Sequence, residues 1–375
     1  AVLCVLAGAA AVLAGPPADS PAPEEGYGSE DVYATNNCVQ CHREGEIAPF
    51  ELTDYDEVVG WAEMIEEVVK EQRMPPWHAD PEHGKFKNDA RLSEADKQLI
   101  YAWVKAGAPQ GDPEELPPPR KFVQGWRIGE PDQVVKMRST PFQVPARGEV
   151  KYQYFVADPG WKEDKYIQAA EARAGNRAVV HHIIVGHTGR IEARSRSHGL
   201  SSDWITAMAP GSLPLILEDG MGKLVPAGSK LVFQVHYTPN GTATVDLGYV
   251  GFTLADASQV KRIVGTNKAA NSRFAIPPHA DNHRVEADFH FRRDSLMLAM
   301  FPHMHLRGKS FRYTAIYPDG KEEILLNVPN YDFNWQNGYA LEEPKLMPAG
   351  TRLHCVAHFD NSEENLANPD PTKRV

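Results

Sequence analysis

The chain has 375 residues, of which 50 are acidic and 39 are basic, and its formal net charge at pH 7 is -11. Because this length exceeds what one hydrophobic core usually organises, we expect two or three domains. A net negative chain offers no electrostatic footprint for a nucleic-acid backbone or an anionic membrane surface, so we expect no nucleic-acid partner.

The first fifteen residues are all apolar or small, and an acidic, proline-rich run follows them. Residues 1–15 therefore resemble the apolar part of a secretion signal whose first residues are missing, since fifteen residues are fewer than a membrane-spanning helix usually needs. We expect residues 16–30 to be a disordered linker and the protein to be periplasmic or secreted. Only an uncleaved segment would attach the chain to a membrane.

Helical periodicity marks residues 31–110. Apolar residues recur at three- and four-residue steps between Val58 and Val69 and predict one amphipathic helix there. Ser93 with Asp96 resembles an N-terminal capping pattern for a second helix, which Gly107 should end. The proline-rich, acidic residues 111–120 are expected to be a linker.

A haem-attachment signature, Cys38-Val39-Gln40-Cys41-His42, lies near the start of this region. Two thiols three residues apart can add to the two vinyl groups of one porphyrin, while His42 coordinates the iron. A redox pair or half of a zinc site is the alternative, but the chain has no second pair of cysteines at this spacing. Residues 31–110 therefore resemble a small class I-like c-type cytochrome carrying covalent haem c.

The second axial ligand of this haem is expected to be Met74, in the proline-stiffened sequence Arg73-Met74-Pro75-Pro76-Trp77. His78 and His83 are the alternatives. Methionine with histidine ligation would raise the reduction potential of the haem. The remaining cysteine of the mature chain, Cys355, has no partner, so no disulfide framework is indicated.

Beyond residue 120 the sequence changes to short alternating or apolar runs separated by turn residues, which predicts antiparallel β-sandwiches. Two consecutive jelly-roll-like sandwiches, 121–258 and 259–375, fit the length. Examples of such runs are 152–156, 179–185, 230–237, 248–254, 285–291, 296–301, 311–317 and 352–359.

Three histidine groups fall within this β region. On a strand, His303 and His305 would share a face and could chelate one ion with Met304 turned away. His236 would share its face with Gln234. The adjacent His181 and His182 can reach one metal together only if the backbone is bulged there. Imidazole suits copper, zinc and iron alike, but a fused one-electron carrier favours copper over zinc.

The order HH, QVHY and HMH, followed by Leu306-Arg307-Gly308-Lys309, resembles the type II copper, ascorbate-dependent monooxygenases, the family of the peptidylglycine α-hydroxylating and dopamine β-monooxygenases. The resemblance covers about two thirds of the chain, from residue 120 onward. It implies an electron-transfer copper bound by His181, His182 and His236. It implies a second, oxygen-activating copper bound by His303 and His305, across an open cleft from the first.

Two features depart from the family. Its oxygen-activating copper takes a third, methionine ligand downstream of the segment that matches 352–359, and no methionine follows that segment here. Met347 precedes the segment at a turn. The peptide-hydroxylating members also carry an arginine two residues before the H-x-H pair, where this chain has Phe301. A carboxylate-ended peptide substrate is therefore in doubt, and an apolar group is favoured.

The resemblance implies an enzyme that hydroxylates an aliphatic C–H bond of an unidentified small molecule or peptide with O2. The fused haem would take electrons from an upstream donor and deliver them to both coppers, because a tethered donor has a high effective concentration at its acceptor. Two alternatives stay open. One is a non-catalytic haem and copper protein that transfers electrons or binds copper. The other is a carbohydrate-binding or adhesive module with structural histidines.

Overall fold

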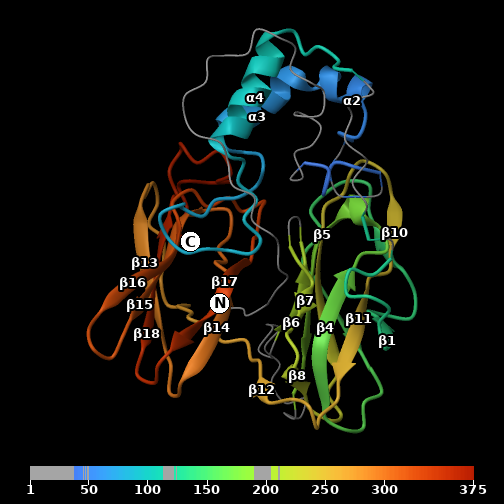
Figure 1. The fold of residues 1–375 in the computed structure, drawn as a ribbon, viewed down its shortest axis with the longest axis vertical. Helices are drawn as coiled ribbons and strands as arrows, with labels where there is room; N and C mark the ends of the chain where they lie inside the picture. Colours follow the sequence, from blue (N-terminus) through green and yellow to red (C-terminus); the bar gives the residue numbers. More distant parts are fainter. Residues whose placement is uncertain are drawn as a thin grey trace. The chain divides into compact units, whose positions relative to one another are not determined.

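The computed structural model describes residues 38–44, 46, 48, 50–112, 122–123, 125–189, 204–209 and 212–375. The expected signal segment, the 16–30 linker and most of the 111–120 linker lie outside these residues. The described chain divides into two compact units. We call residues 38–77 and 89–123 the helical unit, and residues 78–88 with the chain from 125 onward the β unit (Figure 1). No helix in the described ranges has the length and apolar character needed to cross a membrane.

The described α-helices lie in the helical unit and are α2 (Tyr55–Gly60), α3 (Ala62–Lys70) and α4 (Glu94–Lys105). Where one helix was expected between Val58 and Val69, the structure has two. The helix is interrupted at Trp61, which caps the end of α2 and the start of α3. The predicted capping box of α4 is confirmed, with reciprocal hydrogen bonds between Ser93 and Asp96. Gly107 follows α4 with φ of 87°, a conformation that glycine adopts without a steric penalty.

Strands dominate the described chain, as predicted. The first half of the β unit contains β1 (Gln133–Lys136), β2 (Phe142–Val144), β3 (Gln153–Ala157), β4 (Lys165–Arg173), β5 (Val180–His187), β6 (Trp204–Met208), β7 (Leu215–Ile216), β8 (Met221–Val225), β9 (Leu231–Tyr237), β10 (Thr244–Asp246), β11 (Tyr249–Ala255) and β12 (Arg262–Ile263).

Two main sheets form this half: one with the order β1-β11-β4-β8-β12, with β7 beside β4, and one with the order β3-β9-β5-β6. A small pair, β10 and β2, accompanies them. One core joins the two main sheets, with Ile167 and Val250 from the first and Ile183 and Phe233 from the second all fully buried. The expected sandwich architecture is therefore present in this half.

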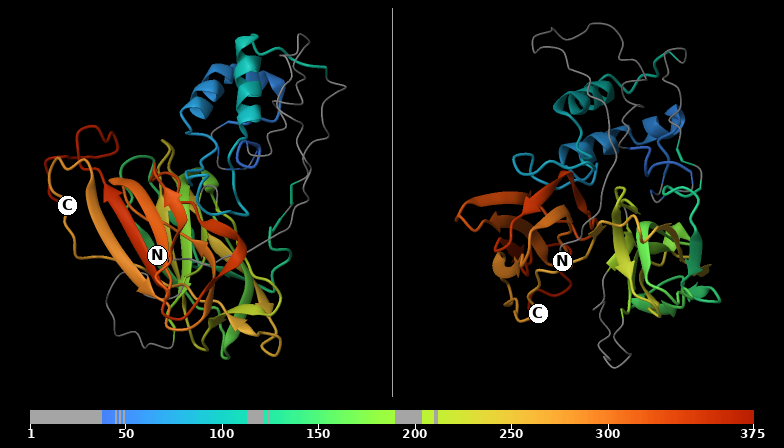
Figure 2. Two further views of the ribbon diagram at one scale, coloured as in Figure 1. Left: turned by 60° about the vertical axis from the view of Figure 1, so that its left-hand side comes forward. Right: turned by 60° about the horizontal axis from the view of Figure 1, so that its bottom comes forward.

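The second half contains β13 (His283–His290), β14 (Ser295–Met300), β15 (Gly308–Ile316), β16 (Glu322–Val328), β17 (Tyr339–Met347) and β18 (Arg352–Phe359). They form a four-stranded sheet in the order β13-β18-β15-β16 and a two-stranded sheet of β14 and β17. Figure 2 shows these strands in orange and red, and those of the first half in green and yellow. Leu298 of β14 nevertheless belongs to the core of the first half, so the two halves pack within one unit.

Residues just after the boundary expected between 258 and 259 still contact the first half. Strand β12, at Arg262–Ile263, pairs in parallel with β8 of the first half. Lys223 on β8 is buried, and its Nζ donates a hydrogen bond of 2.6 Å to Thr266 Oγ1. The first half therefore extends beyond Ala255, because Arg262–Ile263 pair with the edge of β8 and Thr266 accepts a hydrogen bond from the buried ammonium group of Lys223.

Residues 78–88 lie inside the range expected for the cytochrome-like domain but belong to the β unit. The backbone amide of Asp80 donates to Asn327 O at 2.8 Å, and that of Lys87 donates to Ala340 O at 2.9 Å. Phe86 is buried and pairs with Leu341 of β17. Backbone pairing and burial of this aromatic ring explain why the segment departs from the helical unit.

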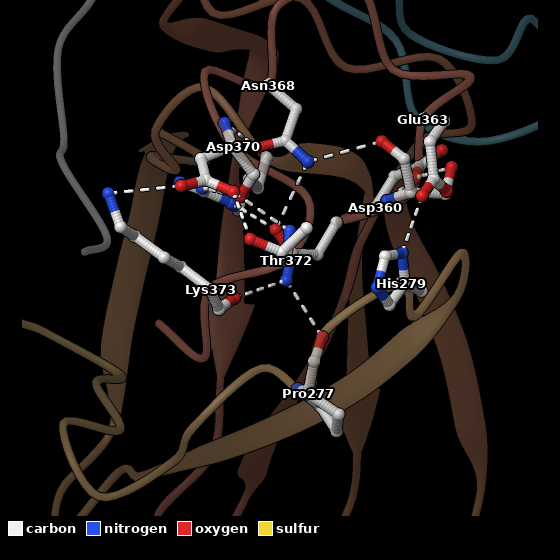
Figure 3. Close-up of polar contacts among 11 residues, drawn as sticks. Pro277, His279, Asp360, Glu363, Asn368, Asp370, Thr372 and Lys373 are labelled. Atoms are coloured by element: carbon white, nitrogen blue, oxygen red, sulfur yellow. Dashed lines mark hydrogen bonds and ion pairs between the residues drawn. The ribbon is translucent and has the colours of Figure 1, made fainter.

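The buried side-chain amide of Asn361, which is 0% exposed, helps to tie the last fifteen residues to the body of the second half. Its Nδ2 donates to Pro277 O at 2.8 Å and to Lys373 O at 2.9 Å, and its Oδ1 accepts from Arg307 Nε at 2.6 Å. Asn368 Nδ2 donates to the same oxygen, and Figure 3 shows Asn368, Pro277 and Lys373 within this group of polar contacts. The segment after β18 is thereby fixed beside Arg307, two residues beyond the H-x-H pair.

Candidate metal centres

The first histidine group converges in the first half of the β unit. His181 and His182 lie on β5, and His236 lies on the neighbouring strand β9. One ring nitrogen from each lies within 4.8 Å of the others. The ring centroids are 5.6 Å apart for His181 and His182, 5.2 Å for His181 and His236, and 5.3 Å for His182 and His236.

A β-bulge brings the two adjacent histidines together. Val180 pairs with Tyr237 and His182 pairs with His236, so His181 is the extra residue on β5. A short 3-10 helix, Arg177–Val179, leads directly into this strand. The bulge that the sequence required for joint binding is confirmed. The bulge changes the direction of the His181 side chain, which in a regular strand would face away from His182.

The nitrogen atoms of this group suit a metal ion. The Nδ1 atoms of His181 and His182 face each other at 3.4 Å. His182 Nε2 lies 3.4 Å from Gln234 Oε1, so a proton on Nε2 leaves the Nδ1 lone pair free. His236 Nδ1 is buried and has no hydrogen-bond partner among the described residues. A cation bound by the three Nδ1 atoms would satisfy polar groups that otherwise carry a desolvation cost.

Burial keeps these imidazoles neutral. Desolvation, followed by the effect of His236 and His181, lowers the pKa of His182 to about 3. Desolvation and His181 lower the pKa of His236 to about 4. Tyr152 packs against both His182 and His236, with ring centroids 5.6 and 4.9 Å away. Because metals bind the neutral imidazole, this environment holds the group in its ligating form.

The second group, His303 and His305, lies in the second half, in an irregular segment after β14 ends at Met300. The prediction that this pair lies on a strand is wrong, but the rings still converge, with centroids 5.1 Å apart and planes at 83°. Met304, which lies between the two histidines in the sequence, is buried. The Tyr331 hydroxyl accepts from Met304 N at 3.1 Å and donates to Met304 O at 2.8 Å, replacing the strand partners that this residue lacks.

His303 is the more deeply placed of the pair. Its Nδ1 lies 2.8 Å from Gln336 Oε1, so a proton on Nδ1 leaves Nε2 as the ligating atom. Desolvation, followed by the effect of His305, lowers the pKa of His303 to about 4. Burial also lowers the pKa of His305.

Phe301 stacks on His303 with ring centroids 6.1 Å apart. It is buried in an apolar cluster with Ile184 and Trp204 of the first half. This side chain therefore covers one side of His303 with hydrocarbon. It supplies no charge to bind a carboxylate.

A third ligand for the second group is not evident. Within the described ranges, the three-membered groups of histidine, cysteine and carboxylate side chains do not include His303 or His305. Met347 is fully buried at the end of β17, where its backbone pairs with Ser295. The other candidate group, Asp80 with Glu82 and His83, lies on the 78–88 segment.

The haem-attachment signature forms one turn in the helical unit. The backbone amides of Cys41 and His42 both donate to Cys38 O, at 3.1 and 2.9 Å. His42 Nδ1 lies 3.1 Å from Phe50 O, which leaves Nε2 free, and burial lowers the pKa of this imidazole. Phe50 stacks on Trp61 at 4.3 Å, and Cys38 packs against the apolar core of the unit. Both thiols and a neutral imidazole on one turn fit covalent haem attachment.

Met74 lies beyond the end of α3, outside regular helix as predicted. Its backbone amide donates to Val68 O at 3.1 Å, and the peptide bond to Pro75 is cis. Its side chain is half-buried. His78 and His83, the alternative axial ligands, belong to the β unit.

Several residues around the metal groups carry no sequence signal. Tyr152, Phe333 and Gln336 contact the histidines from positions remote along the chain, and Tyr331 binds the backbone of Met304 between two of them. None of the four stands in a recognisable spacing with the histidines. Their roles depend on tertiary contacts, so periodicity and motif spacing do not reveal them.

No protein-family model and no curated protein matches the chain. Among solved structures, the chain is similar to a structure of allantoicase, with 7% identity, coverage of 59% of this chain and 79% of that chain, and a TM-score of 0.18. A similarity of this size says nothing about function. The function of the protein is therefore inferred from the geometry of its histidines.

Proposed function

We propose that the protein is an exported, haem- and copper-containing monooxygenase that hydroxylates an aliphatic C–H bond with O2. The observation that carries the proposal is the convergence of His181, His182 and His236, aided by a bulge that brings the two adjacent histidines together. Three neutral imidazoles suit copper. The resemblance to type II copper monooxygenases gives this donor set an electron-transfer role.

The second group is proposed to hold the oxygen-activating copper. Copper bound by His303 and His305 would supply the one-electron redox chemistry with O2. His303 is oriented by Gln336 and shielded on one side by Phe301. The apolar surface excludes water and favours an apolar substrate group over a carboxylate. The substrate is thus proposed to be a small molecule, or a peptide without a terminal carboxylate at this position.

The haem is proposed to be the internal electron donor. Cys38 and Cys41 would form the thioether bonds, and His42 and Met74 would be the axial ligands. The Phe50 carbonyl orients His42, so its Nε2 is available to the iron. Hydroxylation consumes two external electrons, and tethering the donor removes the need for a diffusible reductant to meet the copper directly. An upstream donor would then reduce the haem.

The test begins with metal analysis and ends with electron transfer. We expect covalent haem and two coppers per wild-type chain, with loss of one copper in His182→Ala and of the other in His303→Ala. His290→Ala is the control, because this exposed histidine belongs to neither group. When ferrous wild-type protein is mixed with Cu(II) in a stopped-flow instrument, the haem should become oxidised. Absence of haem oxidation would contradict internal electron transfer.

One observation favours a second candidate function, a non-catalytic periplasmic protein that transfers electrons or binds copper. His303 and His305 have no third histidine, cysteine or carboxylate partner within the described ranges. The two functions differ in oxygen chemistry. A monooxygenase consumes O2 in proportion to hydroxylated product, whereas an electron-transfer protein binds copper and exchanges electrons without product.

A further inference from the structure

One loop of the second half contacts both histidine groups. It runs from Tyr331 to Gly338, between β16 and β17, and we call it the 331–338 loop. Where the resemblance implied an open cleft between the metal sites, the side chain of Phe333 lies against a histidine of each group. The ring centroid of Phe333 is 6.4 Å from that of His181 and 6.1 Å from that of His305.

The two contacts differ in geometry. Phe333 is nearly parallel to His181, with planes at 18°, and nearly perpendicular to His305, with planes at 72°. The next residue, Asn334, forms a backbone hydrogen bond with His181. The first histidine of the bulge therefore has both its ring face and a polar atom held by the second half of the β unit.

The same loop also holds the second group. Gln336 is buried, and its Oε1 lies 2.8 Å from His303 Nδ1. Tyr331 holds the backbone of Met304, between the two ligands, through two hydrogen bonds. Three residues of one short loop thus contact the segment from His303 to His305.

The loop is braced at both ends and in the middle. Tyr331 N donates to Lys309 O on β15 at 2.9 Å, and Gly338 O accepts from Asn88 Nδ2 at 2.7 Å. Asp332 Oδ1 accepts from the backbone and side-chain amides of Asn334 at 2.8 and 2.9 Å. Such bracing fixes Phe333 relative to the second half of the β unit, so its ring can act as a spacer against His181 of the first half.

We propose that Phe333 is a positioning residue that sets the relative orientation of His181 and His305, and hence the separation of the two metals that these groups bind. The metal part of this inference rests on the proposed function. The ring arrangement itself does not, because it follows from contacts among protein side chains alone. Residues that orient metal ligands through packing and hydrogen bonds commonly tune metal sites.

The first test uses the metal-free full-length haem protein with labelled histidine, observed by proton–carbon NMR of the imidazole rings. Phe333→Leu removes the aromatic ring while keeping an apolar side chain, and Phe333→Ala removes more of it. Both variants should shift the ring resonances of His181 and of His305. The matched control is Phe274→Leu, which alters an aromatic residue of the second half that packs on Phe359. If either imidazole keeps its wild-type resonances in both Phe333 variants, Phe333 does not bridge the groups.

The second test uses Cu(II)-loaded protein and measures the copper–copper distance distribution by pulsed dipolar electron paramagnetic resonance. We expect a narrow distribution in wild type and in Phe274→Leu, and a broader one with a changed mean in Phe333→Leu at equal copper content. An unchanged distribution would overturn the spacer role. A wild-type protein that binds no copper would instead contradict the proposed function, and the NMR result would still decide whether Phe333 positions both rings.

Discussion

The hydrogen bond from His303 to Gln336 determines which imidazole nitrogen faces a metal. Gln336 is buried, so bulk water does not compete with its carbonyl oxygen for the Nδ1 proton of His303. A fixed tautomer presents the Nε2 lone pair in one direction. The corresponding contact at the first group, between His182 and Gln234, is longer at 3.4 Å. Side-chain orientation is therefore more tightly controlled at the second group.

Replacing Gln336 tests this control. Gln336→Leu should lower copper affinity at the second site by about 10–100-fold, the effect usual for loss of a ligand's outer partner, and leave the first site unchanged. Gln336→Glu, which keeps an acceptor oxygen for Nδ1, should restore most of the affinity. Competition titrations with a copper chelator measure both sites. Equal weakening of both sites would indicate general destabilisation rather than loss of a specific contact.

Cys355, which the sequence left without a partner, is buried on β18 and forms no disulfide. Desolvation raises the pKa of its thiol to about 12. In the unfolded chain the thiol loses its proton near pH 8.5, so above that pH the folded state binds more protons than the unfolded state. The contribution of this residue to stability is therefore complete below about pH 8.5 and falls as the pH rises toward 12.

The prediction is measured as the pH dependence of the free energy of unfolding between pH 8 and 11. The wild-type protein should lose up to about 1.4 kcal/mol more per pH unit than Cys355→Ala above pH 9. Other buried ionisable groups contribute equally to both proteins and cancel in the difference. Parallel curves for the two proteins would show that the thiol is accessible in the folded state.

At the scale of elements, the irregular segment that carries His303 and His305 depends on a glycine at the start of β15. A Cβ atom at Gly308 would lie 2.7 Å from Tyr331 Cδ1 and 2.8 Å from Met304 Cβ. These are the two residues whose hydrogen bonds replace strand pairing in this segment. Close approach of the 331–338 loop therefore requires the absence of a side chain at position 308.

Gly308→Ala is expected to destabilise the β unit by about 1–3 kcal/mol through overpacking and to weaken copper binding at the second site. Gly265→Ala is a suitable control, because that glycine is exposed and nothing lies within 4 Å of its added Cβ. Chemical denaturation and copper titration provide the two measurements. A Gly308→Ala protein with wild-type stability and wild-type copper affinity would refute the packing argument.

Strand prediction succeeded where hydrophobic residues alternate or cluster. All eight runs named from the sequence have counterpart strands, and that of 352–359 is matched by β18 at both ends. Strand β4, from Lys165 to Arg173, is not among these runs, because its sequence KYIQAAEAR is rich in alanine and lacks alternation. Its inner residues are buried by neighbours on both sides in the sheet, so tertiary packing decided a conformation that local propensity does not favour.

At the scale of the whole molecule, both histidine groups lie in one compact unit and the haem signature lies in the other. A ligand that binds only the folded state stabilises the unit that contains its site. Copper should therefore act on the β unit. The haem band reports separately on the helical unit.

Differential scanning calorimetry with and without Cu(II) tests this assignment. Free copper at about 100 times its dissociation constant should stabilise the β unit by about 2.7 kcal/mol for each site that it fills and raise the transition temperature of this unit. His182→Ala should lose the part of this shift that comes from the first site. Thermal loss of the haem Soret band should change less than the β-unit transition. If copper shifted only the Soret transition, our assignment of the copper sites to the β unit would be wrong.

The sequence by itself determined the capping box at Ser93, the position of Met74 outside a helix, the mainly β character after residue 120 and the need for a bulge at His181 and His182. These features depend on local backbone chemistry or on the two-residue period of strands, which spacing encodes. Only the tertiary structure decided that residues 78–88 join the β unit, that His303 and His305 lie off a strand, and that Phe333 contacts both groups. Those outcomes depend on contacts between residues far apart in the chain, where burial and hydrogen bonding outweigh local preference.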